Sequence, residues 1–189
     1  EREVALPEGV LTRDAMVVVN DPTIDVIVEL IGGIEPAREY ITTALRNGKP
    51  VVTGNKELLA NVGTELFAAA DEAGVDLLFE AAVAGGIPIV RALRESLRGE
   101  PITRVMGIIN GTTNFILSEM RDKGLSFEQV LAEAQKLGYA EADPTYDIEG
   151  IDAAHKITLM SAIAFGIPVQ FSKVYTEGIT KLTGEDIRY

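Results

Sequence analysis

Cysteine and tryptophan are absent from the 189-residue sequence, and histidine occurs once. Without cysteine the chain can form no disulfide, use no thiolate nucleophile and build no cysteine zinc site, and one histidine cannot make a histidine-rich metal site. Any bound metal is therefore expected to be a hard cation held by carboxylates or backbone carbonyls. Catalysis, if the chain carries it, is left to Asp, Glu, Lys, Tyr, Ser or Thr.

Positive charge is also scarce, because 17 Lys and Arg against 29 Asp and Glu give a net charge of -12. Nucleic acids and anionic membranes bind basic surfaces, so neither is an expected partner. No apolar run approaches the roughly 18 residues that cross a bilayer. The first residues, EREVALPEG, lack the apolar core of a signal peptide. The expected location is the cytoplasm.

The first 83 residues alternate between short apolar runs and amphipathic segments. Strands are predicted at Asp25–Ile31, Pro50–Gly54 and Val75–Val83, and helices at Glu35–Lys49 and Lys56–Gly74. This alternation is typical of a parallel sheet wound with helices. Nothing matches the G-x-G-x-x-G turn of a dinucleotide-binding sheet. The predicted fold class is α/β, with residues 1–83 forming a partial Rossmann-like domain.

The pattern changes after residue 83. Helices are predicted at Gly85–Gly99, from about Asn114 to Gly124, at Ser126–Gly138 and at roughly Ile151–Phe165, and strands at Ile102–Asn110 and Val174–Thr183. Residues 84–189 are therefore expected to form an α+β domain with helices packed on a mixed sheet. The missing glycine-rich turn and the final TGEDIRY, which looks like the start of a helix, predict an internal fragment of a longer protein.

Asp152 and Lys156 are the first candidates for a functional site. They are four residues apart at the start of a predicted helix, so they share one face. The pair could be a surface ion pair worth a few tenths of a kcal/mol. However, the helix is otherwise almost wholly apolar and follows a segment rich in Asp and Glu. Surplus carboxylates beside a semi-buried lysine suit recognition of a substrate ammonium, and the two alternatives remain open.

Three further segments could contribute to a site. Lys56 follows a strand at the rim where open α/β sheets bind ligands, and the alternative is an exposed lysine at a helix start. The segment NGTTN, residues 110–114, is a polar strand-to-helix corner that could line a cleft or simply cap a helix. The backbone around the glycine pair of Glu80–Pro88 could hold a cation, or could be a tight helix entry.

Residues Ala134–Lys156, AQKLGYAEADPTYDIEGIDAAHK, resemble the signature of the homoserine dehydrogenase family. The matching positions are Ala134, Gly138, Asp143, Pro144, Asp147, Gly150, Asp152 and Lys156. The segments VVTGNKELLA, EAAVAGGIPI and GIINGTTNFIL resemble the same family in the expected order. The resemblance covers essentially the whole chain and implies NAD(P)-dependent interconversion of L-homoserine and L-aspartate 4-semialdehyde, on the route to threonine and methionine.

The resemblance also implies roles for individual residues. Lys156 would give a proton to the carbonyl oxygen as hydride arrives, with Asp152 holding the substrate or the lysine. Glu141 would bind the homoserine amino group, with Asp147 as a further substrate-binding residue. Lys56 would lie beside the nicotinamide and the reacting oxygen.

Cofactor and cation contacts are implied mainly through the backbone. Gly32 and Gly138 would approach the cofactor. A monovalent cation, usually sodium, would be held mainly by carbonyls, and the positions implied are Glu80, Val83, Gly85 and Ile87. The family also implies a homodimer, with residues 84–189 as a catalytic and dimerisation domain truncated at its C-terminus. Because the glycine-rich loop is missing, the alternative is a catalytically inactive fragment or dimer-forming module.

Overall fold

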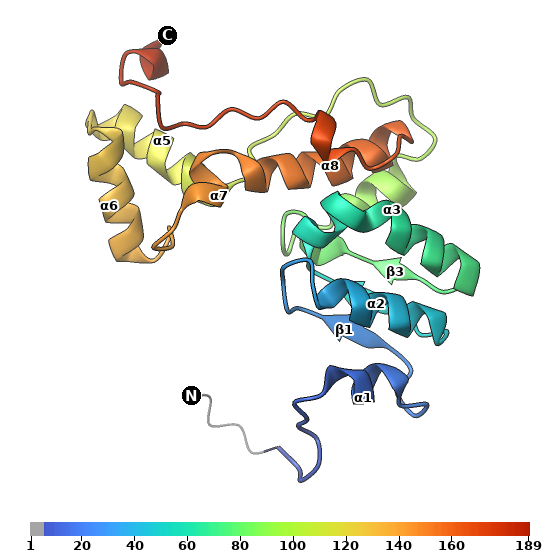
Figure 1. The fold of residues 1–189 in the computed structure, drawn as a ribbon. Coiled ribbons are helices and arrows are strands. Elements are labelled where there is room, and N and C mark those ends of the chain that lie inside the picture. The colour runs from blue at the N-terminus through green and yellow to red at the C-terminus, as the bar shows by residue number, and fades with distance from the viewer. Residues whose placement is uncertain (1–5) are drawn as a thin grey trace. The chain divides into compact units, whose positions relative to one another are not determined.

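The computed structural model describes residues 6–189, and the chain divides into two compact units, Glu1–Ala82 and Val83–Tyr189 (Figure 1). The first unit contains a three-stranded parallel sheet in the order β1-β2-β3. The strands are β1 (Ile27–Glu29), β2 (Val51–Thr53) and β3 (Leu77–Leu78). The α/β class predicted from the sequence is confirmed.

The two helices predicted for the first unit are present as α2 (Ala37–Arg46) and α3 (Lys56–Ala73). A further helix, α1 (Ala15–Asn20), precedes them and was not predicted. Helix α3 begins after Asn55, whose side chain accepts the Leu58 N–H at 3.1 Å, and ends at Gly74 with φ +67°. Both ends thus have the capping chemistry that the sequence displays. Helices α2 and α3 pack together and onto the sheet, burying Ile41, Leu45, Leu58, Leu59 and Leu66.

The third strand is shorter than expected. The sequence predicts a strand over Val75–Val83, but only Leu77 and Leu78 pair with β2, and Glu80–Ala82 form the short 3₁₀ helix η1. The strand ends where the chain turns into η1, one residue short of the end of β2, because the β2–β3 ladder stops at Val52 and Leu78.

The second unit is built from helices. The chain passes through α4 (Ile89–Arg91) and a π-helical turn, η2 (Ala92–Ser96), and then forms α5 (Gly111–Lys123), α6 (Phe127–Leu137), α7 (Thr145–Ile148) and α8 (Ile151–Phe165), followed by the 3₁₀ turns η3 (Phe171–Lys173) and η4 (Asp186–Arg188). Helices α5 and α6 pack against each other around Ile116, Met120 and Val130 (Figure 1). The predicted capping box at Ser126 and Gln129 is present, and the predicted bounds of α8 are confirmed.

Two predictions for the second unit are wrong in this structure. Residues 102–110 and 174–183 are predicted to be strands of a mixed sheet, but within residues 6–189 neither belongs to a β-sheet (Figure 1). Strand propensity reflects how well side chains fit a packed sheet surface, and Met106 and Ile108 are 78% and 80% exposed here. Helix α5 also begins at Gly111 rather than near Asn114, because Asn110 caps it.

Within residues 6–189, no helix combines the length and the apolar character needed to cross a bilayer.

Candidate active site

Helix α8 brings Asp152 and Lys156 together on one face. The Lys156 ammonium donates to Asp152 Oδ2 at 2.5 Å, and the two side chains are only 17% and 9% exposed. An ion pair on a solvated helix surface would be far more accessible. The choice left open by the sequence is therefore decided against a surface pair, since a lysine buried to this degree needs a charged partner.

A second segment, distant in sequence, completes the environment of this pair. The Asn110 amide donates to Asp147 Oδ1 at 2.6 Å and to Asp152 Oδ2 at 2.9 Å. The Lys156 ammonium also donates to the carbonyl of Ile109 at 2.7 Å. We call Asn110, Asp147, Asp152 and Lys156 the lysine–carboxylate cluster. It contains one ammonium and two carboxylates, so when all three are ionised it carries a net negative charge.

The Asp-Pro pair before α7 explains how Asp147 reaches the cluster. Asp143 accepts the Thr145 hydroxyl at 2.6 Å and the Thr145 N–H at 3.1 Å, which orders the turn before α7 and lowers the pKa of Asp143. Asp147 lies on α7, and Gly150 takes φ +78° between α7 and α8. This backbone conformation suits glycine, and it sets the direction in which α8 presents Asp152.

Glu141 and Gly138 lie on the connection between α6 and α7. Gly138 ends α6 with φ +77°, and the carbonyl of the next residue, Tyr139, accepts from the Thr112 hydroxyl of α5 at 2.9 Å. Glu141 is exposed, and its backbone carbonyl accepts from Gln135 at 3.0 Å. Within residues 6–189, no hydrogen bond joins the Glu141 carboxylate to the lysine–carboxylate cluster.

In the first unit a buried carboxylate organises the rim of the sheet. Glu29, 3% exposed, accepts the N–H of Ile31 at 2.7 Å and of Gly32 at 3.2 Å through Oε1. Its Oε2 accepts from the Thr53 hydroxyl at 2.6 Å. Glu29 therefore ties the turn after β1 to the end of β2. Glu29 is not among the site residues predicted from the sequence, although an acidic residue within an apolar strand is the signal that could have identified it.

Asn55 links that rim to the start of α3. Its Nδ2 donates to the carbonyl of Gly33 at 2.7 Å, and its own N–H is accepted by the Thr53 hydroxyl at 3.0 Å. Lys56 follows as the first residue of α3 and is half-buried. The turn containing Gly32 and the helix start at Lys56 are thus parts of one hydrogen-bonded rim, at the carboxyl ends of parallel strands where open α/β sheets bind ligands.

The positions implied for a cation are distributed over a turn. Glu80 lies in η1, and Val83, Gly85 and Ile87 follow it. The Ile87 carbonyl already accepts the Ile89 N–H at 2.8 Å. Within the part of the chain that the structure describes, no group of three or more Asp, Glu or His side chains could hold a metal ion. Carbonyl ligation by this turn stays a prediction.

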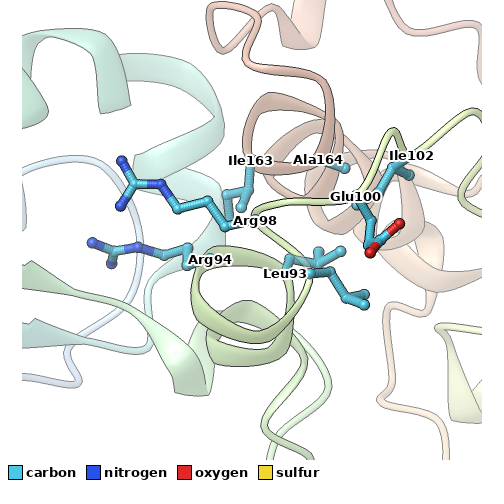
Figure 2. A pocket seen from close by; sticks show the side chains of 8 residues that line it. Leu93, Arg94, Arg98, Glu100, Ile102, Ile163 and Ala164 are labelled. Atoms are coloured by element: carbon cyan, nitrogen blue, oxygen red, sulfur yellow. The ribbon is translucent and has the colours of Figure 1, made fainter.

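A separate cavity of about 330 Å³ lies in the second unit between η2, the end of α8 and residues 100–102. Figure 2 shows Arg94 and Arg98 pointing the same way on one side, with Ile163 of α8 close by. Both arginines are exposed. The cavity shares no lining residue with the lysine–carboxylate cluster, so it does not belong to the candidate site.

The fold and the cluster define a class: an α/β protein in which Glu29 and Asn55 tie together the rim of a parallel sheet, followed in the chain by a helical unit with a buried lysine–carboxylate cluster. Comparison with known families makes this specific. The model described as "Homoserine dehydrogenase, NAD binding domain" matches residues 1–80, and the model described as "Homoserine dehydrogenase" matches residues 88–189. The chain belongs to the homoserine dehydrogenase family.

Individual relatives agree. Homoserine dehydrogenase from Pseudomonas aeruginosa is 62% identical over 179 residues, 95% of this chain and 41% of that protein. The crystal structure of a homoserine dehydrogenase from Thiobacillus denitrificans matches with a TM-score of 0.92 and 66% identity, over 94% of this chain and 41% of that one. A hyperthermophilic archaeal homoserine dehydrogenase in complex with NADPH matches with a TM-score of 0.81 and 33% identity, over 90% of this chain and 53% of that one. The chain thus spans less than half the length of the first two relatives.

Proposed function

We propose that the protein containing this chain is a homoserine dehydrogenase that interconverts L-homoserine and L-aspartate 4-semialdehyde with NAD(P)(H). The observation that carries the proposal is the buried Lys156–Asp152 pair with Asp147 beside it, in a chain of this family. The fold alone would not identify the reaction, because proteins with parallel α/β sheets catalyse many different reactions.

The proposed chemistry assigns proton transfer to Lys156. When bound, the nicotinamide cofactor supplies or accepts the hydride. The aldehyde oxygen becomes an alkoxide as it gains hydride, so a positively charged donor at that oxygen stabilises the transition state. Lys156 provides this charge and the proton, and in the reverse direction it removes the proton from the homoserine hydroxyl. Asp152 positions the ammonium through their 2.5 Å contact.

Substrate recognition is assigned to the carboxylates. Homoserine carries an ammonium, and the cluster's two carboxylates exceed its one ammonium, so a cationic group is attracted rather than repelled. We propose that Asp147 and Asp152 contribute to this binding and that Glu141 contacts the substrate amino group. Glu141 is exposed on the α6–α7 connection, so it is accessible to a ligand.

Cofactor binding is assigned to backbone groups and to Lys56. We propose that the turn containing Gly32 and the backbone of Gly138 approach the dinucleotide, and that Lys56 lies beside the nicotinamide. The rim organised by Glu29 and Asn55 supports this assignment, as does the archaeal relative solved with NADPH. A cation at Glu80, Val83, Gly85 and Ile87 remains part of the proposal, but no reaction step depends on it.

The remaining parts of the proposal concern organisation. Residues 1–83 form part of the NAD(P)-binding domain, and residues 84–189 belong to the catalytic and dimerisation domain of a homodimer. The exposed apolar side chains along residues 102–110 support contact with the second subunit of the homodimer at this segment. The proposed location is the cytoplasm. The chain has no cysteine, so it has no disulfide that a reducing environment could break.

The proposal is tested with Lys156→Ala in the natural full-length protein. We expect kcat for NADP-dependent homoserine oxidation to fall by roughly 10²- to 10⁴-fold, the range for loss of a general acid or base. Lys136→Ala is the matched control, since Lys136 is an exposed lysine in the last turn of α6. Turnover that survives Lys156→Ala as it survives Lys136→Ala would contradict the role of Lys156. A wild-type protein without homoserine oxidation would contradict the function itself.

A further inference from the structure

Asn110 uses both ends of its side-chain amide. The residue is 8% exposed and lies where the extended segment 102–109 meets α5. Its Oδ1 accepts the Thr113 N–H at 2.8 Å and the Thr113 hydroxyl at 2.9 Å. A backbone N–H can only donate, so the amide oxygen must face α5 and the amide nitrogen must face the other way.

The nitrogen end meets two carboxylates. Nδ2 donates one hydrogen bond to Asp147 at 2.6 Å and one to Asp152 at 2.9 Å, and these acceptors are 37 and 42 residues away in sequence. Two ionised carboxylates that converge on one point repel each other. An amide with two N–H groups is a neutral group that can bind both at once, whereas a third carboxylate or a hydroxyl could not.

The same corner also holds the lysine. Asp152 Oδ2 accepts from both Asn110 and Lys156, so this oxygen is fixed from two directions. The residue before Asn110 provides the second acceptor, because the Lys156 ammonium donates to the Ile109 carbonyl at 2.7 Å. Residues 109 and 110 therefore fix both members of the Asp152–Lys156 pair.

We propose that Asn110 is a positioning residue of the active site: its amide holds Asp147 and Asp152 together so that Asp152 is aligned on Lys156. The inference rests on the proposed function and adds to it a residue that acts through the carboxylates rather than on the substrate. The competing explanation is purely structural, since Asn110 is also the N-cap of α5.

Two substitutions separate the roles of cap and bridge. Serine and aspartate both cap helices about as well as asparagine. Asn110→Ser therefore keeps the cap but cannot reach two carboxylates, and Asn110→Asp keeps the cap but offers no donor and adds a negative charge. The matched controls are Asn114→Ser and Asn114→Asp, because Asn114 is exposed one turn further along α5.

The first measurement is steady-state kinetics in the natural full-length protein. We expect kcat for homoserine oxidation to fall by about 10-fold or more in both Asn110 variants, the consequence of leaving a buried acceptor unsatisfied. Both Asn110 variants are expected to lose some thermal stability for the same reason, so kcat is measured well below their unfolding temperatures, and the Asn114 variants are expected to keep both kcat and stability. A kcat in Asn110→Ser equal to that in Asn114→Ser would overturn the inference.

The second measurement does not need turnover. Acetic anhydride acetylates the neutral form of an amine, so the extent to which Lys156 is labelled at one fixed pH, relative to Lys136 and read by mass spectrometry, reports how firmly Asp152 and the Ile109 carbonyl hold its ammonium. We expect Lys156 to be labelled more in Asn110→Ser than in the wild type, because the amide no longer fixes Asp152, and to be labelled as in the wild type in Asn114→Ser. Equal labelling of Lys156 in Asn110→Ser and Asn114→Ser overturns the inference. Absence of homoserine oxidation in the wild type would instead count against the proposed function, and the labelling result would still stand.

Discussion

At the scale of single residues, the buried carboxylates of the two units have different hydrogen-bond partners and therefore different roles. Asp152 is held against a lysine and an amide, whereas Glu29 accepts two backbone N–H groups and one hydroxyl. A carboxylate satisfied by neutral donors fixes the backbone around it. Glu29 is therefore expected to matter for the shape of the turn at Gly32, and only through that turn for any ligand.

This expectation is checked with Glu29→Gln. Glutamine has only one side-chain oxygen, so its NH2 group faces either the N–H groups of the turn or the Thr53 hydroxyl. We expect the free energy of unfolding to fall by about 1–3 kcal/mol, the effect of leaving buried polar groups unsatisfied, as measured by urea denaturation. Glu39→Gln, an exposed substitution in the first turn of α2, is expected to change it little. Equal stabilities for the two variants would contradict the role of Glu29.

At the scale of secondary-structure elements, the chain after α8 returns over the start of that helix. The Ile179 N–H donates to the Ile148 carbonyl at 2.8 Å, and Gly178 lies against the α7–α8 turn. A Cβ added at Gly178 would lie 2.8 Å from the Ile148 carbonyl and 3.0 Å from Glu149 Cα. These are backbone atoms of the turn that presents Asp152, so the returning segment requires glycine at this point.

Gly178→Ala is expected to destabilise the second unit by about 1–3 kcal/mol, as overpacking against backbone does. Gly184→Ala is the matched control in the same C-terminal segment, because a Cβ there meets nothing within 4 Å. Thermal unfolding of the two variants side by side measures the difference. A Gly178→Ala protein as stable as Gly184→Ala would show that the returning segment does not pack on the turn.

The predicted elements succeeded or failed for identifiable reasons. Helices α3, α6 and α8 carry their own start and stop signals, such as Asn55, the Ser126 capping box and Gly166, so their bounds follow from local sequence. Residues 102–110 and 174–183 have strand-like composition but find no sheet neighbour within residues 6–189. A strand is stabilised by its partners rather than by its own residues.

At the scale of the whole molecule, the two units carry different parts of the proposed function. The lysine–carboxylate cluster is assembled entirely within the second unit. The first unit contributes the rim at Gly32 and Lys56, but the sequence has no G-x-G-x-x-G turn to bind a pyrophosphate at a helix N-terminus.

The 189-residue polypeptide produced alone is therefore expected to bind NADPH more weakly than the natural full-length protein, because backbone N–H groups at a helix N-terminus bind the phosphates of dinucleotides. Titration followed by NADPH fluorescence, with both proteins under one set of conditions, measures the ratio. Equal affinities would show that the rim alone carries cofactor binding, and would count against the alternative of an inactive fragment.

The sequence by itself determined the α/β class, the main helices and the shared face of Asp152 and Lys156, because these depend on residues within one or two helical turns of each other. It also contained the signature that led to the family. The tertiary structure decided the burial of that pair, the bridge from Asn110 to Asp147 and Asp152, and the tie between Glu29 and Thr53. These contacts join residues 24 to 42 positions apart, and only the packing of helices and strands brings such residues within hydrogen-bonding distance.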